Sequence, residues 1–172
     1  MVLQLMLGLI ATLLLCTSID ARANYNTTPL HLAAQSGHTN VVELLLEKGA
    51  SLGREGTTPL QSAALKGRIK VLELLTRKGA SIEAATIYNY TTLHLAALGG
   101  YADVVELLIG KGASTEARDT LGLTPLHVAE MGGHTGIVEL LLRKQASIEV
   151  MGEDNDTLLH LAAYGGHDGC FW

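Results

Sequence analysis

Histidines at regular intervals are the residues of this sequence most suited to chemistry, because imidazole can bind metals and transfer protons near neutral pH. His31, His94, His127 and His160 each end a Thr-x-Leu-His motif, and 63, 33 and 33 positions separate them. A zinc site needs ligands that converge on one point, with nitrogens about 2.0–2.1 Å from the metal. Side chains repeated at these intervals line a stack one after another, so we predict structural hydrogen bonds and no metal site.

The other reactive residue types form no known catalytic pattern. The sequence has no Ser/His/Asp set, paired-carboxylate motif, phosphate-binding glycine loop or HExxH motif. Its two cysteines, Cys16 and Cys170, are too few for a disulfide framework or a zinc site. We therefore predict that the chain is not an enzyme and takes no cofactor, metal or small-molecule substrate.

Composition and charge narrow the class further. The 172 residues amount to about one ordinary domain, and the 17% of charged residues lies below the usual ~25%. With 48% apolar residues, the chain is typical of a folded protein rather than a disordered one. The net charge of −5 excludes a basic surface for nucleic acid, so we predict no nucleic-acid binding.

The elements that must position the histidines recur along the chain. The Thr that opens each motif stands at 28, 58, 91, 124 and 157, with spacings of 30, 33, 33 and 33. Nine residues after each Thr comes a glycine: Gly37, Gly67, Gly100, Gly133 and Gly166. The first four units then carry an apolar run, such as residues 41–46, and end near Lys-Gly-Ala-Ser.

Each unit predicts two helices. Thr is a good N-cap, because its hydroxyl accepts a hydrogen bond from an unpaired backbone N–H, and Pro fits the first helical position. An Ala pair after the motif keeps the first helix thin, so that neighbouring units approach closely. Glycine ends the first helix in the left-handed conformation, and Gly49, Gly79 and Gly112 end the second in the same way. Gln145 takes this place in the fourth unit, where we expect some backbone strain.

The 33-residue period and the Thr-Pro-Leu-His signature resemble the ankyrin repeat, over residues 18–169. The resemblance implies an all-α repeat solenoid, a stack of helix-turn-helix units with β-hairpin fingers. It also implies a concave face built from the fingers and the first helices, and each unit buries its apolar side only against a neighbour. The expected units one to five are residues 24–53, 54–86, 87–119, 120–152 and a truncated 153–172. A short finger follows unit one, because nine positions separate Gly49 from Thr58 but twelve separate Gly79 from Thr91.

Two interpretations fit the apolar N-terminal segment, residues 1–23. Its apolar core and the Ala21-Arg22-Ala23 site resemble a cleaved signal peptide, although no Lys or Arg stands near the start. Alternatively it is the remnant helix of a preceding repeat, since Ser18-Ile19-Asp20-Ala21 matches Ser81-Ile82-Glu83-Ala84. A membrane contact is expected only if residues 1–19 act as an anchor. The family resemblance implies an intracellular, cytoplasmic protein, whereas cleavage of Met1–Ala23 implies a secreted one.

Three Asn-x-Thr sequons have two explanations. Asn26, Asn89 and Asn155 would be glycosylation acceptors in a secreted chain. Each also stands two residues before the motif Thr, where the other units have Gly56 and Gly122. A choice of only Gly or Asn is typical of a turn that requires positive φ, so turn and cap together account for the sequons.

The family resemblance implies that partner contacts come from the finger tips and from the two residues after the Ala pair. At these positions, units three and four carry mostly apolar residues. Four of the five tyrosines of the chain also occupy contact positions, in units one, three and five. Exposed apolar patches and tyrosines are typical of binding sites. The expected contact residues are Tyr25, Leu65, Ile87, Tyr88, Tyr90, Leu98, Leu121, Leu123, Met131 and Tyr164. The alternative is that Ile87, Leu121 and Leu123 only pack between adjacent fingers.

The expected function is a non-enzymatic protein–protein interaction module, an ankyrin-repeat scaffold or adaptor that binds an apolar peptide or helix on its concave face. An acidic flank of Glu153, Asp154 and Asp156 would attract basic residues of that partner. The alternatives are a secreted or toxin-associated repeat protein, or a fragment of a longer ankyrin-repeat protein.

Overall fold

The computed structural model describes residues 18–23, 26–53, 56–152 and 156–166. Within these ranges it contains nine helices and no β-strand. The apolar run of residues 1–17 and Tyr25 lie outside the described residues, as do Asn155, Glu153 and Asp154. The two interpretations of the N-terminal segment therefore both remain predictions.

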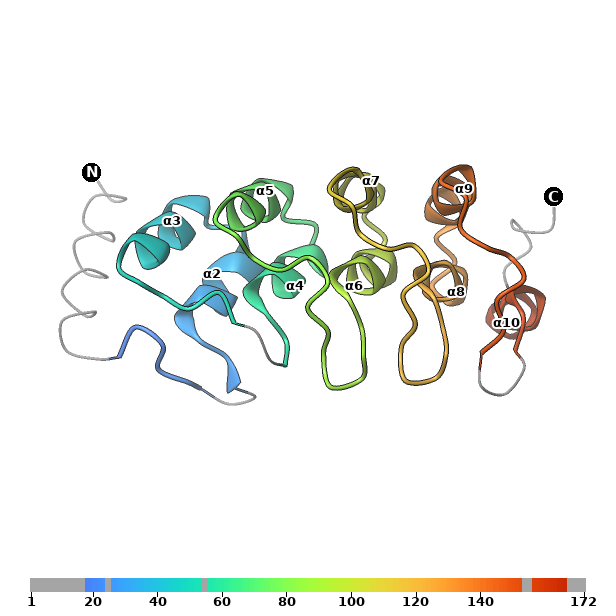
Figure 1. Cartoon of the computed structure of the whole chain (residues 1–172), viewed down its shortest axis with the longest axis horizontal. Coiled ribbons are helices and arrows are strands. Elements are labelled where there is room, and N and C mark those ends of the chain that lie inside the picture. The colour runs from blue at the N-terminus through green and yellow to red at the C-terminus, as the bar shows by residue number, and fades with distance from the viewer. Residues whose placement is uncertain (1–17, 24–25, 54–55, 153–155, 167–172) are drawn as a thin grey trace.

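Each of the first four units forms a pair of helices, as the repeated pattern predicts. The pairs are α2 (Pro29–Ser36) with α3 (Thr39–Glu47), α4 (Pro59–Ala64) with α5 (Ile69–Arg77), α6 (Thr92–Gly99) with α7 (Ala102–Gly110), and α8 (Pro125–Met131) with α9 (Thr135–Arg143). The first helix of unit five is α10 (Leu158–Gly165). Figure 1 shows the first helices in one row, the second helices in another, and the fingers projecting beyond the first helices. The predicted all-α repeat solenoid is confirmed.

Local sequence explains where the helices begin and end. The motif threonines have extended backbone at the N-cap, and Thr28, Thr58 and Thr124 are followed by a proline in the first turn. Gly100 ends α6 at φ 80°, in the left-handed region that glycine tolerates. Gln145 adopts φ 66° after α9, where the other units have glycine. This confirms the predicted strain, which costs about 1 kcal/mol for a residue with a Cβ.

The fingers are hairpin turns rather than the expected β-hairpins. In unit three the N–H of Thr86 donates to the carbonyl of Tyr90 at 3.0 Å, and in unit four Asp119 donates to Leu123 at 2.9 Å. No ladder of backbone pairs extends beyond these five-residue turns, and the described residues contain no strand. Asn89 adopts φ 58°, as predicted for the turn. Its side-chain amide donates to the carbonyl of Arg118 in the next finger at 2.5 Å.

The motif histidines join each unit to the next finger. The backbone N–H of Thr91 donates to Nδ1 of His94 at 3.2 Å, so this ring is neutral and its Nε2 carries the proton. Nε2 donates to the carbonyl of Leu123, in the finger of the next unit, at 3.1 Å. His31 and His127 make equivalent bonds to Thr57 and Val150, at 2.7 and 2.9 Å. The predicted structural role of these histidines is thus confirmed.

Gln61 performs the same task in unit two, where the motif lacks histidine. Its amide oxygen accepts from the N–H of Thr58 at 2.8 Å. Its amide nitrogen donates to the carbonyls of Ala84 and Tyr90 at 2.6 and 3.1 Å. A neutral amide therefore substitutes for a neutral imidazole, which shows that the contact requires one acceptor and one donor but no charge.

A second row of hydrogen bonds joins the bases of the fingers. The carboxylates of Asp20, Glu83 and Glu116 accept from the backbone N–H of Ser51, Ser114 and Ser147, at 3.0, 2.9 and 3.0 Å. Each bond connects a carboxylate at the base of one finger to a backbone N–H at the base of the next finger. Unit one has Gly53 where the others have an acid, so this finger base carries no such carboxylate. The two rows together set the register between units.

Glu130 is the one departure from the Ala pair within the buried first helices. Ala34, Ala64 and Ala97 occupy the same place in units one to three, and all are fully buried. Glu130 is likewise 0% exposed, and both of its carboxylate oxygens lack a hydrogen-bond partner. A buried polar group without a partner costs roughly 1–3 kcal/mol. The fourth unit is therefore destabilised by a residue that the neighbouring units lack.

We expect the substitution Glu130→Ala to raise the free energy of unfolding by about 1–3 kcal/mol, because it removes the unpaired carboxylate from the core. Urea denaturation followed by circular dichroism measures the change. Glu139→Ala, at an exposed position of α9, is the control and should change stability by less than about 0.5 kcal/mol. A loss of stability in Glu130→Ala would mean that the carboxylate has a stabilising partner.

We expect stability to decrease in mild acid because of the motif histidines. Burial lowers the pKa of His31, His94 and His127 below the usual 6.5, so the unfolded chain takes up protons that the folded chain refuses. This contribution is complete above pH 6.5 and is lost progressively as the pH falls below that value. The melting temperature should therefore fall between about pH 7 and 5.5.

The double substitution His94→Gln/His127→Gln tests the cause, since Gln61 shows that an amide fits the site. Its melting temperature should depend less on pH over the same interval. An unchanged pH dependence would assign the effect to other groups.

Candidate functional site

A hollow on the finger side of the stack lies between units one, two and three. Its volume is about 570 Å³. Finger residues and first-helix residues contribute to it together, as the concave face of the repeat implies. The lining consists of Asn26, Thr27, His31, Gln35, Gly56, Thr57, Gln61, Ser62, Leu65, Thr86, Ile87, Tyr88, Tyr90 and Leu95.

The third finger forms one wall of this hollow and is held rigidly. The hydroxyl of Thr86 accepts from the backbone N–H groups of Tyr88 and Tyr90, at 3.3 and 3.1 Å. Gln61 reaches from α4 to the two carbonyls at the base of the finger, Ala84 and Tyr90. These bonds fix the backbone while Tyr88 stays 61% exposed. An exposed aromatic side chain on a fixed backbone loses little entropy when it binds a partner.

Tyr90 connects this wall to the body of the stack. Its ring meets the ring of His94 edge to face, with centroids 5.5 Å apart and planes at 89°. Burial and the nearby charge of Asp119 raise the pKa of its phenol. Tyr90 is therefore half buried, and only part of its ring is available to a partner.

The short finger after unit one explains why the hollow lies here. A second hollow, of about 660 Å³, shares five lining residues with the first: Asn26, His31, Gly56, Thr57 and Ile87. The residues shared by both hollows include Gly56 and Thr57, which end the short finger. This finger is three residues shorter than its neighbours, and we infer that its length contributes to the space beside it.

The structure separates the predicted contact residues into three groups. Leu65, Ile87, Tyr88 and Tyr90 line the hollow together. Leu98, Leu121, Met131 and Tyr164 are exposed but do not line it. Leu123 is only 7% exposed, so it is withdrawn from the contact set. Its carbonyl accepts from both Asp119 and His94, and this fixes the residue inside the fourth finger.

The hollow lies between units one and three, whereas the predicted contact residues extend to units four and five. Sequence reasoning missed His31, Thr57, Ser62 and Leu95 as lining residues, since their positions are those of the repeat motif itself. The spacing between Gly49 and Thr58 was the signal for the hollow, because it predicted the short finger. A shorter finger predicts a hollow only when the positions of the two neighbouring fingers are known. The sequence does not contain those positions.

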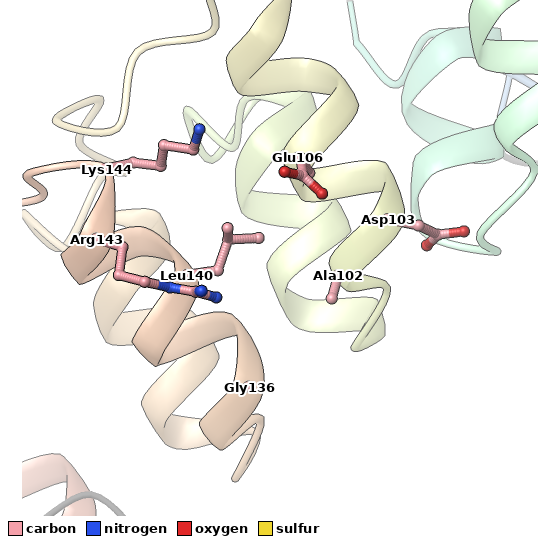
Figure 2. A pocket seen from close by; sticks show the side chains of 7 residues that line it. All are labelled: Ala102, Asp103, Glu106, Gly136, Leu140, Arg143 and Lys144. Atoms are coloured by element: carbon pink, nitrogen blue, oxygen red, sulfur yellow. The ribbon is translucent and has the colours of Figure 1, made fainter.

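A further cleft lies on the opposite side, between second helices α7 and α9 (Figure 2). It has a volume of about 510 Å³. Glu106 of α7 stands on one wall, and Arg143 and Lys144 at the end of α9 stand on the other, whereas the Asp103 carboxylate points away from α9 in Figure 2. The small residues Ala102 and Gly136 leave the space open. Leu140 is its one large apolar lining residue, so the cleft lacks the aromatic anchors of the concave face.

Within the part of the chain that the structure describes, no group of three or more His, Cys, Asp or Glu side chains could hold a metal ion. Over the same ranges, no helix has the length and apolar character needed to cross a membrane.

Comparison with known proteins identifies the family. The family model described as ankyrin repeats, in three copies, matches residues 4–86 and matches residues 87–172 a second time. A search of curated proteins found no match to this sequence. The two matched segments together span far more than half of the chain, and the structure shows the same succession of helix pairs and fingers. The chain therefore belongs to the ankyrin repeat family.

Proposed function

We infer that this chain is a protein–protein interaction module, as ankyrin repeats generally are, in a family that is typically non-enzymatic. We propose that this chain binds a protein partner along its concave face, anchored in the hollow between units one and three. The observation that carries the proposal is the exposure of Ile87 and Tyr88 beside that hollow, at 78% and 61%. Two neighbouring large apolar side chains so open to water are typical of an interaction site.

A row of apolar side chains continues from the hollow along the first helices. Leu65, Leu98, Met131 and Tyr164 occupy the same place in successive units, 33 positions apart. Leu98 and Met131 are about half exposed, and Tyr164 is 91% exposed. A partner segment that lies along this row meets one apolar side chain per unit. Such spacing suits an extended peptide or an amphipathic helix, rather than a small molecule held by one pocket.

The hollow supplies the polar contacts that orient the partner. His31, Gln35, Thr57 and Ser62 line it beside the apolar residues. Gln61, on the floor, already makes its full set of hydrogen bonds to the protein. We therefore expect Gln61 to keep its position when a partner binds.

We expect Tyr88→Ala and Leu98→Ala each to weaken partner binding by about tenfold, as is typical of residues at the centre of an interface. The probe is a peptide selected from a random displayed library on the full chain, and isothermal titration calorimetry measures its affinity. Ile148→Ala, an exposed apolar residue away from the row, is the matched control and should leave the affinity unchanged. If neither Tyr88→Ala nor Leu98→Ala alters the affinity, the concave face is not the binding site.

A further inference from the structure

Unit two lacks a large apolar side chain that every other unit carries in its first helix. At this place, four residues after the motif Thr, the other units have Leu32, Leu95, Val128 and Leu161. Unit two has Ser62 instead. The hydroxyl of Ser62 donates to the carbonyl of Thr58, in its own helix, at 3.2 Å. The serine therefore leaves open the space that a leucine or valine takes in the other units.

This space belongs to the concave hollow. Ser62 and Leu95 both line the hollow, together with Gly56 and Thr57 from the end of the short finger. A shortened finger and a shortened side chain thus coincide in unit two. The volume of about 570 Å³ lies within the range of roughly 300–1,000 Å³ that is typical of ligand sites. The hollow therefore has room for a whole side chain of a partner.

Rings and aliphatic side chains surround this room. Tyr88, Tyr90 and His31 place rings in the lining. Nδ1 of His31 accepts from the backbone N–H of Thr28 at 3.2 Å, and Nε2 donates to the carbonyl of Thr57 at 2.7 Å. Both nitrogens are thus occupied, and the ring offers a neutral surface. Because aromatic rings pack favourably edge to face or offset against one another, the lining suits an aromatic side chain.

The hollow and its edge differ in charge. No charged residue is among the lining residues that the structure describes, and a charge buried there would lose its hydration. Lys66 directly follows Leu65 at the edge of the hollow and is exposed. The other units have Ser36, Gly99, Gly132 and Gly165 at the place of Lys66, so unit two alone carries a charge there. An uncharged group therefore matches the hollow, and a carboxylate matches its edge.

We propose, on the basis of the function proposed above, that the partner is a peptide segment that inserts one aromatic side chain into the hollow and places a carboxylate beside Lys66. Ser62 is then the specificity-determining residue, because its small side chain provides the depth that an aromatic ring needs. The apolar row that continues through Leu98 and Met131 contacts the rest of the segment.

The test uses the full chain and a peptide selected on it from a random displayed library, with affinity measured by isothermal titration calorimetry. We expect the selected peptides to share one aromatic residue next to Asp or Glu. Replacing that aromatic residue by Ala should weaken binding by at least about tenfold, as at the centre of an interface. Ser62→Leu should weaken the original peptide to the same degree, because the leucine fills the hollow. The two changes combined should weaken binding less than about twofold beyond either alone, since both remove the same contact.

Matched controls separate loss of the hollow from loss of folding. Ser81→Leu makes the same substitution at an exposed serine outside the lining and should leave the affinity unchanged. Ser62→Leu should fold, because leucine stands at the same place in three other units, and circular dichroism checks this. The alanine-substituted peptide requires no change in the protein, so it tests the aromatic anchor even if Ser62→Leu destabilises the chain.

A charge reversal tests the carboxylate. Lys66→Glu should weaken the selected acidic peptide by about two- to fivefold at low salt, as is typical of an exposed ion pair. Lys78→Glu reverses a charge at the end of α5, outside the hollow and its edge, and should have no effect. Equal affinities of Lys66→Glu and Lys78→Glu would overturn the proposed carboxylate.

Leu98→Ala distinguishes this inference from the proposed function, because Leu98 belongs to the apolar row but not to the lining of the hollow. If Leu98→Ala weakens binding and Ser62→Leu does not, the concave face binds the partner without an anchor in the hollow, and only the inference fails. If neither weakens binding, the proposed function fails as well. Selected peptides without a shared aromatic residue would overturn the inference. So would self-association of the full chain that Ser62→Leu abolishes, since a second copy would then fill the hollow.

Discussion

The stack depends on one constraint, that each unit completes the burial of its apolar side only by packing against its neighbours. Leu30, Leu60, Leu93 and Leu126 are sealed from water in this way, one per unit. Burial alone would allow neighbouring units to slide, because apolar contact has no direction. The bonds from the motif histidines, or from Gln61, to the next finger supply the direction and hold the helices in one register. Stability and alignment thus come from different residues of the same short motif.

The fingers differ from unit to unit, whereas the helical core beneath them is regular. They carry few backbone hydrogen bonds of their own, and bonds to the neighbouring unit hold them in place instead. A finger can therefore be shortened without damage to the helices below it. The short finger after unit one opens two hollows beside it and leaves Ile87 uncovered. The variation that creates a binding surface lies where the fold tolerates change.

Departures from the repeat also show which positions the stack controls most strictly. Gln145 tolerates the left-handed conformation at a surface turn, where the cost is confined to its own backbone. Glu130 lies in the closely packed layer of first helices, where neither carboxylate oxygen finds a partner. The difference follows from water, which solvates the side chain of Gln145 and is excluded from Glu130.

Much of this molecule could be predicted from its sequence, since the interactions that define each unit are local. Caps at Thr28 and Gly100, the positive φ of Asn89 and the strain at Gln145 all depend on residues a few positions apart. The period of 33 then predicted the solenoid, because identical units can bury identical faces only by stacking. The tertiary structure alone decided what remains exposed. Leu121 and Leu123 are the same residue type two positions apart, yet one is 56% and the other 7% exposed. The position of the concave hollow likewise depends on neighbouring units, because the burial of a side chain is set by what lies beside it in space.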